Sequence, residues 1–202
     1  MALEGGEWPN APLPLLERWI QDARDAAQPH PASVAFVTAT STGRPSARTV
    51  TLKRIEADSL LVTTALWTRK AQELRENPHV TLLFHWAGMG RQTHIEGRAR
   101  LGSRALSAEL FSERARDHQY QTIVSRQGEM IEDLAPLRRR LEHLRLEDRS
   151  PTCPADWGAV AVTPHVVEFW EESPDRLHDR VLYEHQPLGD WQRVRLSRGS
   201  RS

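Results

Sequence analysis

Apolar positions along the chain follow two different periods. Residues 12–23 place apolar side chains three and four positions apart, which predicts an amphipathic helix opened by a proline. Residues 33–40, 59–66 and 79–86 are apolar and rich in β-branched residues, which predicts strands. Residues 91–101 alternate apolar and polar side chains, the pattern of a strand with one buried face. Further strands are predicted at 46–55, 157–163, 165–171, 178–184 and 190–196.

Helices and turns are expected between these strands. Thr68 is placed to cap a short helix that stops before Pro78, and Ser103 begins another that runs to about Arg114. The turn after residue 40 contains Gly43, the residue expected to take a positive φ. A longer helix is predicted from the spacing of Ile131, Leu134, Leu137, Leu141 and Leu144. Many antiparallel-type strands, short connections and few helices predict a mainly β protein, a barrel with helices packed outside it.

Bulk composition narrows the class of protein. The chain has 202 residues, enough for one sizeable core, and 27 Lys and Arg balance 27 Asp and Glu. This neutrality argues against a general binder of nucleic acids or membrane surfaces. Cys153 is the only cysteine, which excludes an internal disulfide and a Cys-rich metal site. Because no apolar run is long enough to cross a membrane, we expect a soluble cytoplasmic protein. We also expect residues 1–10 to have little order.

Two cations stand where a helix begins. Arg69 and Lys70 fall in the first turn after Thr68, although the helix dipole already places partial positive charge there. Free backbone N–H groups, a hydroxyl and two cations together make a plausible phosphate site. The alternative is that both side chains simply extend into solvent from a surface helix.

Arg48 and Lys53 raise a related question on the strand 46–55. Five positions separate them, so they face opposite sides of an ideal strand. Either they serve different partners, or a bulge or bend brings them to one side. A third reading is an exposed edge strand whose charges prevent aggregation.

The segment DRLHDR, residues 175–180, contains a row of three donors. Read as a strand, it places Arg176, His178 and Arg180 on one face, where they repel one another unless an anion or an electron-rich ring lies opposite. Local neutralisation by Asp175 and Asp179 is the alternative. No Ser-His-Asp order, HExxH, GxGxxG or P-loop motif occurs in the chain, so nucleophilic, zinc and Rossmann mechanisms have no support.

Several spaced segments together resemble the pyridoxamine 5′-phosphate oxidase family. In chain order they are LPLLERWIQDA, GRPSARTVTLK, TRKAQELRENP, LLFHW, RQTHIEGRARL, SRQ, EFW and RLHDR, from about residue 13 to 198. The spacings RQ-x-x-x-EG and EFW-x5-RLHDR are the most specific of them. The resemblance implies one antiparallel, FMN-binding split β-barrel domain of Greek-key type over residues 11–198. It also implies a homodimer with flavin mononucleotide (FMN) at the subunit interface.

The resemblance assigns FMN-binding roles residue by residue. In the family the arginine matching Arg48 and the pair matching Arg69 and Lys70 hold the FMN phosphate. Gln127 matches the first residue of a Gln-Ser pair from the partner subunit, and Gly128 replaces the serine. Thr63 stands where the family has a tyrosine. The full set of implied FMN-binding residues is Arg48, Thr49, Val50, Lys53, Thr63, Thr64, Arg69, Lys70, Gln92, Gln127, Trp170 and Arg180; Trp170 and Arg180 match partner-subunit residues that close over FMN.

The substrate site matches the family less completely. The implied substrate-binding residues are Lys53, Arg114, His118, Arg176 and His178. Arg176 and His178 match residues that cover the substrate, and they are the implied catalytic pair. Leu110 stands in a tyrosine position and His118 in a serine position of the family's phosphate clamp, and the N-terminal stretch that caps the substrate is absent.

Three functions remain open at this point. The resemblance implies an FMN-dependent oxidase in which hydride passes to flavin N5 and O₂ reoxidises the flavin, giving hydrogen peroxide. Its substrate would be pyridoxine or pyridoxamine 5′-phosphate. The segment VSRQGE and the changed clamp also resemble the phenazine-biosynthesis branch, which oxidises dihydro-aromatic precursors. A flavin-binding protein without turnover is the alternative from another class.

Overall fold

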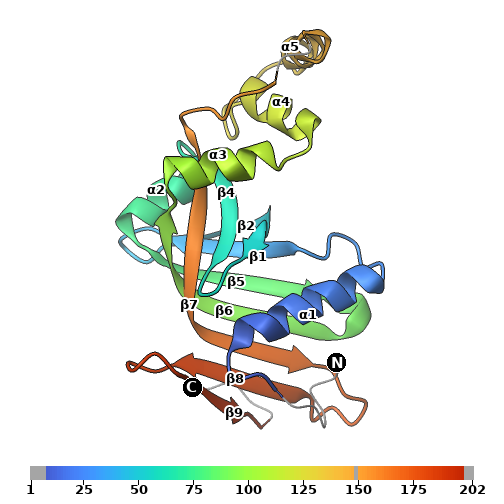
Figure 1. Cartoon of the computed structure of the whole chain (residues 1–202), viewed down its shortest axis with the longest axis vertical. Helices are drawn as coiled ribbons and strands as arrows, with labels where there is room; N and C mark the ends of the chain where they lie inside the picture. The colour runs from blue at the N-terminus through green and yellow to red at the C-terminus, as the bar shows by residue number, and fades with distance from the viewer. Residues whose placement is uncertain (1–7, 148–149, 198–202) are drawn as a thin grey trace.

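One antiparallel β-sheet organises the chain. The computed structural model describes residues 8–147 and 150–197 (Figure 1). Within them the strands pair in the order β2-β1-β5-β6-β7-β4-β3, and β8 and β9 extend the sheet from β7. The strands are β1 Ser33–Ala39, β2 Pro45–Thr51, β3 Arg54–Ile55, β4 Leu60–Ala65, β5 His79–Trp86, β6 Arg91–Leu101, β7 Trp157–Glu171, β8 Asp179–His185 and β9 Trp191–Arg195. The expected mainly β, antiparallel architecture is confirmed.

Helices lie at the periphery, as predicted. They are α1 Pro12–Asp25, α2 Arg69–Glu76, α3 Arg104–Ser112, α4 Arg116–Val124 and α5 Ala135–Leu146, with a short 3₁₀ turn η1 at Ala87–Met89. Helix α1 crosses the sheet, whereas α3, α4 and α5 gather at one end of the long axis, opposite β8 and β9 (Figure 1). None of the helices in the described part of the chain combines the length and apolar character that a membrane crossing requires.

An aromatic cluster joins α1 to the sheet. Trp19 is fully buried and meets Phe169 edge-to-face, with ring centroids 5.1 Å apart, and Trp86 at 6.2 Å. The Arg91 guanidinium lies 4.8 Å from the Trp19 ring centroid and donates to Glu171 Oε1 at 2.7 Å. The rings bury a large apolar area, and the paired guanidinium closes one edge of the cluster.

Strand β7 is longer than the sequence pattern predicts. Two strands were expected at 157–163 and 165–171, but the chain forms one, since Pro164 falls where the register with β6 shifts between Glu96 and Gly97. A proline is tolerated at such an irregularity because a ladder hydrogen bond is already missing there. The long β7 connects β4 at one end to β8 at the other.

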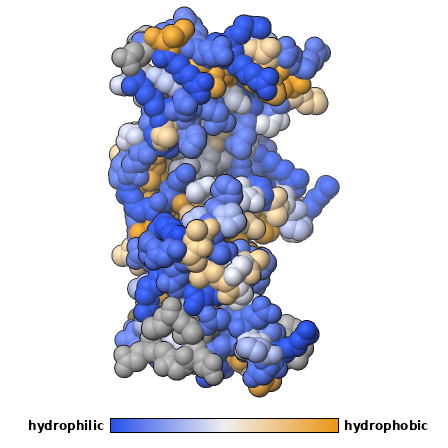
Figure 2. Space-filling model, turned by 90° about the vertical axis from the view of Figure 1, so that its right-hand side faces the viewer, coloured by the Kyte–Doolittle hydropathy of each residue, from blue (hydrophilic) through white to orange (hydrophobic). Residues whose placement is uncertain are grey.

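The helical end contains a helix that the pattern missed. Helix α4 is short and has no clear apolar stripe, so periodicity gave no sign of it. Helix α5 begins after the first two apolar positions of its predicted stripe, and none of its residues is buried in this chain. In Figure 2 apolar side chains lie among hydrophilic ones at this upper end, where Ile131 and Leu134 are exposed.

The N-terminal segment is partly described. Residues 1–7, within the stretch expected to have little order, lie outside the described residues. Trp8 packs against the core, and the Pro9 carbonyl accepts a hydrogen bond from Tyr183 Oη at 3.1 Å. The start of the described chain is therefore held against β8 and β9.

The aromatic cluster predicts a large and local stability effect. Phe169→Ala removes a fully buried ring that also contacts Tyr183, so we expect the free energy of unfolding to fall by about 3–5 kcal/mol. Urea denaturation at a fixed protein concentration measures this change. Leu188→Ala, at a side chain that is 95% exposed, is the matched control and should change stability by less than about 0.5 kcal/mol. Equal effects for the two variants would contradict this account of the core.

Candidate functional site

A cavity of about 360 Å³ lies where β2, β4 and α2 meet the α3–α4 region. Most of the residues implied by the family resemblance line it: Arg48, Thr49, Val50, Lys53, Thr63, Thr64, Lys70, Arg114, His118 and Gln127. Arg69 does not line the cavity itself but stands beside Lys70 on α2. The fold thus brings together side chains that are up to 79 positions apart in the chain.

The cavity is positively charged and lacks acidic groups. Among the described residues that line it, Arg48, Lys53, Lys70 and Arg114 are cations, and none is Asp or Glu. Like charges in a partly enclosed space repel one another, so such a set is stable only at some cost to folding. An arrangement of this kind favours an anionic ligand.

A break between β2 and β3 places Arg48 and Lys53 at the same cavity. Strand β2 ends at Thr51 and β3 begins at Arg54, while the Lys53 amide donates to Leu61 O at 2.8 Å. This break resolves the question raised by the odd spacing, because Lys53 no longer follows the alternation of β2.

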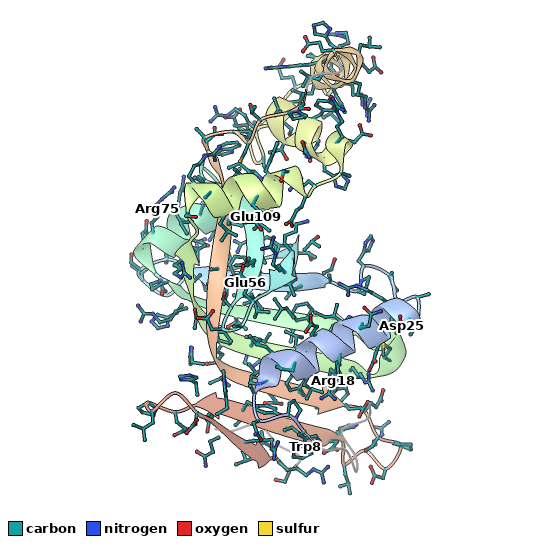
Figure 3. All side chains as sticks on the ribbon, viewed as in Figure 1. Trp8, Arg18, Asp25, Glu56, Arg75 and Glu109 are labelled. Carbon is teal, nitrogen blue, oxygen red and sulfur yellow. The ribbon has the colours of Figure 1, made fainter. Side chains whose placement is uncertain are left out.

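The residue after Lys53 faces acidic partners instead. Arg54 pairs with Glu56, Glu109 and Glu113, of which Glu56 and Glu109 are marked in Figure 3. These carboxylates neutralise Arg54 on the outside of the cavity. Lys53 has no such acidic partner among the described residues, so its charge remains available to a ligand.

Lys70 is an enclosed cation. Its side chain is 7% exposed, and Nζ donates to Thr64 Oγ1 at 3.2 Å. Burial lowers the pKa of Lys70, and repulsion from Arg48 lowers it further. Thr68 occupies the predicted N-cap position of α2, but its hydroxyl donates to Ala65 O at 2.7 Å and does not cap the helix.

The Arg48 guanidinium is hydrogen-bonded to groups on β1 and β2. Its Nη1 donates to Phe36 O at 3.0 Å and to Thr38 Oγ1 at 2.7 Å, and its Nη2 donates to Ser46 Oγ. Both hydroxyls also contact Glu73, a buried carboxylate on α2. Arg48 is therefore tied to α2 through a buried polar network.

Glu73 connects Arg48 with Arg69. Its Oε1 accepts from Arg69 Nε at 2.7 Å, and its Oε2 lies 3.6 Å from Arg48 Nη2. Burial alone raises the pKa of Glu73, but hydrogen bonds from Ser46, Thr38 and Arg69 outweigh it and lower the pKa to about 2. Sequence reasoning missed Glu73; the sign that was available is its position four residues after Arg69 on a predicted helix.

Arg114 and Lys53 form a cationic pair at the cavity, in addition to the pair of Arg48 and Lys70. Burial lowers the pKa of both groups, and the pKa of Lys53 is lowered further by Arg114. The Arg114 guanidinium lies 5.3 Å from the Trp157 ring centroid and donates through Nη2 to His118 O at 3.2 Å. Its Nε is buried without a hydrogen-bond partner among the described atoms. An unpaired buried N–H is costly to the fold.

The resemblance assigned two further positions, 110 and 118, to the phosphate clamp that contains Lys53 and Arg114. His118 lines the cavity, whereas Leu110 is 1% exposed and packs in a separate apolar cluster with Phe111 and Trp157. Leu110 therefore supplies no group that reaches a ligand in the cavity.

Gln127 lies at the cavity of its own chain. The resemblance assigned it to the partner subunit, but here it lines the same cavity as Arg48, and its carbonyl accepts from Trp67 Nε1 at 3.0 Å. Gly128 follows with φ of 92° and nothing within 4 Å of an added Cβ. A serine at this backbone angle would be strained although space is available.

Three further predicted residues form a second group on the sheet. Gln92 on β6, Trp170 on β7 and Arg180 on β8 are directly paired across the three strands. The Arg180 guanidinium makes two contacts with Glu168 Oε1, at 2.8 and 2.7 Å. None of these residues lines the cavity described above.

The strand reading of DRLHDR is wrong for residues 175–178, because β8 begins at Asp179. Arg176 and His178 have φ of 61° and 52°, so they lie in a turn before β8 and not in an alternating row. The Ser173 amide donates to His178 Nδ1 at 3.3 Å, and the His178 ring lies 4.9 Å from that of Trp170. Of the two aspartates that could neutralise this row, Asp179 pairs instead with Arg195 at 2.8 Å, whereas Asp175 interacts electrostatically with His178.

Comparisons with known proteins identify the family. Residues 20–148 match the family described as pyridoxamine 5′-phosphate oxidase, and residues 157–197 match the pyridoxine 5′-phosphate oxidase C-terminal dimerisation region. The pyridoxine/pyridoxamine 5′-phosphate oxidase of Rubrobacter xylanophilus is 40% identical over 187 residues, covering 92% of this chain and 86% of that protein. The enzyme of the same name from Bacteroides fragilis is 37% identical over 197 residues, covering 96% and 84%.

Solved structures agree with this family. PhzG from Burkholderia lata 383, solved in complex with tetrahydrophenazine-1-carboxylic acid, matches with a TM-score of 0.91 and 29% identity, covering 98% of this chain and 97% of that one. A pyridoxamine 5′-phosphate oxidase-related, FMN-binding protein from Nostoc punctiforme has a TM-score of 0.77 at 14% identity, covering 94% and 99%, which supports the fold alone.

The chain belongs to the pyridoxamine 5′-phosphate oxidase family. It is accordingly an FMN-dependent oxidase with the split-barrel fold, and it forms a homodimer through its C-terminal region.

The residues at the cavity fit FMN. A nucleotide phosphate needs cationic and N–H donors, and Arg48 and Lys70 provide them without a competing carboxylate in the cavity lining. Trp67 and Val50 add apolar surface beside these donors. The donor set thus matches a ligand that has one anionic end and one aromatic end.

Glu73 predicts a defined pH dependence of stability. Its folded pKa of about 2 lies below the usual value of 4.5, so the carboxylate stabilises the fold fully above pH 4.5 and progressively less as pH falls toward 2. In Glu73→Gln this contribution is absent at every pH. We expect the difference in unfolding free energy between wild type and variant to shrink from pH 5.5 to pH 3, as measured by urea denaturation.

Phe169→Ala serves as the control for this pH series. It removes no titratable group, so its difference from wild type should stay constant over the same range. A Glu73→Gln difference that is equally constant would show that the carboxylate has no depressed pKa.

Proposed function

We propose that the cavity binds FMN through its phosphate at Arg48, Arg69 and Lys70. The observation that carries this proposal is the cavity lining itself, four cations with no acidic residue among the described residues. Arg69 and Lys70 occupy the first turn of α2, where the helix dipole adds partial positive charge. The cationic side chains and the positive end of the helix dipole repel one another, and a bound phosphate dianion reduces this repulsion.

We propose further that each complete site draws on two subunits. Gln92, Trp170 and Arg180 lie along three paired strands but line no part of the cavity in their own chain. In a homodimer the Trp170 and Arg180 of one subunit can close the FMN site of the other. This arrangement explains why one chain holds two separate groups of site residues.

The proposed reaction is oxidation of pyridoxine or pyridoxamine 5′-phosphate. FMN held by Arg48, Arg69 and Lys70 would supply the redox chemistry, the oxidation of the substrate coupled to reduction of O₂ to hydrogen peroxide. Lys53 and Arg114 bind the substrate's anionic group, and both of their side chains line the cavity. His118, which lines the same cavity, contributes a further side chain that can donate a hydrogen bond.

Arg176 and His178 orient the substrate in this proposal. Because His178 Nδ1 accepts from the Ser173 amide, the neutral imidazole carries its proton on Nε2 and presents that N–H as a donor. Arg176 is exposed in the same turn and supplies a second donor. Their roles are positioning and stabilisation of charge that changes during hydride transfer.

One observation favours a second candidate substrate class, a dihydro-aromatic carboxylate. Leu110 is buried away from the cavity and His118 stands in the family's serine position, so two neutral donors of the phosphate clamp are missing or altered. The structural similarity to PhzG, a protein seen with tetrahydrophenazine-1-carboxylic acid, points in the same direction. A carboxylate needs fewer donors than a phosphate does.

Removing the phosphate-binding cations should weaken FMN binding. In Arg69→Ala/Lys70→Ala we expect the dissociation constant for FMN to rise about tenfold to a hundredfold, because charge-assisted hydrogen bonds to the phosphate are lost. Quenching of flavin fluorescence by the flavin-free chain measures it. Arg75→Ala is the matched control, an arginine at the other end of α2 (Figure 3) whose Nη2 donates to Leu66 O. Unchanged FMN affinity in the double variant would overturn the phosphate assignment.

The substrate class is tested by peroxide release. We expect the purified yellow protein to produce hydrogen peroxide with pyridoxine 5′-phosphate and to use pyridoxine without its phosphate far less well, because Lys53 and Arg114 require an anion. Turnover of dihydrophenazine carboxylates alone would replace the first candidate by the second. Turnover of neither substrate would indicate a flavin-binding protein without catalysis.

A further inference from the structure

Glu73 is a carboxylate enclosed behind the proposed phosphate site. It is 3% exposed and stands in the second turn of α2, on the side that faces β1 and β2. Ser46 Oγ lies 2.6 Å from its Oε2, Thr38 Oγ1 contacts the same oxygen, and Arg69 Nε lies 2.7 Å from its Oε1. This group takes no part in the reaction proposed above.

The chemistry of the partners determines the direction of these hydrogen bonds. A guanidinium can only donate and a carboxylate can only accept. Since Arg48 donates to the hydroxyls of Thr38 and Ser46, both hydroxyl protons are directed to Glu73. The two hydroxyls therefore form parallel bridges from Arg48 to the carboxylate.

The same carboxylate restrains Arg69. The Arg69 side chain is 58% exposed, and an exposed arginine normally samples many rotamers. Its Nε donates to Glu73 across one helical turn, and this bond restricts the orientation of the guanidinium. The two terminal nitrogens, Nη1 and Nη2, do not take part in this bond. One buried carboxylate thus contacts two cations that belong to different elements, β2 and α2.

We propose that Glu73 is a positioning residue for the FMN phosphate, holding Arg48 and Arg69 in their binding geometry. This inference rests on the proposed function, which places the phosphate at these cations. Arg48, Arg69, Lys70 and Glu73 together have a net charge of +2, which matches a phosphate dianion.

The proposal makes a prediction whose sign distinguishes two roles. If Glu73 only lowered the charge of the site, its removal would strengthen phosphate binding. If it positions the arginines, removal weakens binding, because an amide at residue 73 offers one accepting oxygen and cannot accept from both Arg69 and the two hydroxyls. Because the network is buried, water cannot replace the lost acceptor. We therefore expect the loss of positioning to outweigh the gain from removing a negative charge.

The test compares FMN with riboflavin, which has the same ring system but no phosphate. In Glu73→Gln we expect the dissociation constant for FMN to rise about tenfold, while that for riboflavin stays within about twofold of wild type. Flavin fluorescence quenching with the full-length, flavin-free chain measures both. Ser46→Ala removes one bridge and keeps the carboxylate, so it should give a smaller loss in the same direction, which keeps the test available if Glu73→Gln folds poorly.

Glu171→Gln is the matched control. Glu171 is also a shielded carboxylate, 15% exposed, with an arginine nitrogen at 2.7 Å, but its partner Arg91 belongs to the aromatic core and not to the cavity. This variant should lose stability and keep the wild-type ratio of FMN to riboflavin affinity.

Three outcomes would overturn the inference. They are tighter FMN binding in Glu73→Gln, equal losses for FMN and riboflavin, and unchanged affinity for both. If Arg69→Ala/Lys70→Ala still weakens FMN binding in any of these cases, the phosphate assignment stands and only the role of Glu73 fails. If neither variant affects FMN, the proposed site itself is wrong.

Discussion

The repulsion among Arg48, Lys53, Lys70 and Arg114 is the constraint around which the site is built. Four cations share one cavity without an acidic residue in its described lining, and burial lowers the pKa of both lysines. Such an arrangement opposes folding, so the rest of the barrel has to hold it in place. The aromatic cluster around α1 and the long ladder of β7 supply that support away from the site. An anionic ligand then gains from charge that is already in position.

The fold separates the site residues into two groups for a physical reason. Strand β7 carries Trp157 at the cavity and Trp170 in the second group, and these residues lie roughly 40 Å apart along an extended strand. Strand β7 bends between these two residues and carries the second group to the lower part of the sheet, away from the cavity of its own chain (Figure 1). In a dimer, the second group of one subunit can instead reach the cavity of the other subunit. A divided site is therefore consistent with the dimer of this family.

The departures that the family resemblance implies fall at both the flavin positions, Thr63 and Gly128, and the substrate positions, Leu110 and His118. The proposed phosphate cations are all present, and Glu73 adds a buried counter-charge that links β2 to α2. At the other end of the cavity Leu110 has become part of an apolar cluster, and His118 replaces a hydroxyl with an imidazole. In the proposed assignment, flavin binding and substrate choice therefore depend on different parts of one cavity.

Local pattern was sufficient for most elements of this chain, and the spaced motifs were sufficient for its family. Regular alternation and helical spacing predicted α1, α2, the strands of the sheet and the cationic first turn of α2, because each depends on near neighbours in the chain. The pattern missed α4, divided β7 in two and extended β8 through Arg176 and His178, where positive φ values make a turn. Only the tertiary structure showed that a strand break brings Lys53 to the cavity that Arg48 lines, and that Glu73 joins Arg48 to Arg69. Those contacts connect segments distant in the sequence, and no local periodicity specifies which distant side chains will meet.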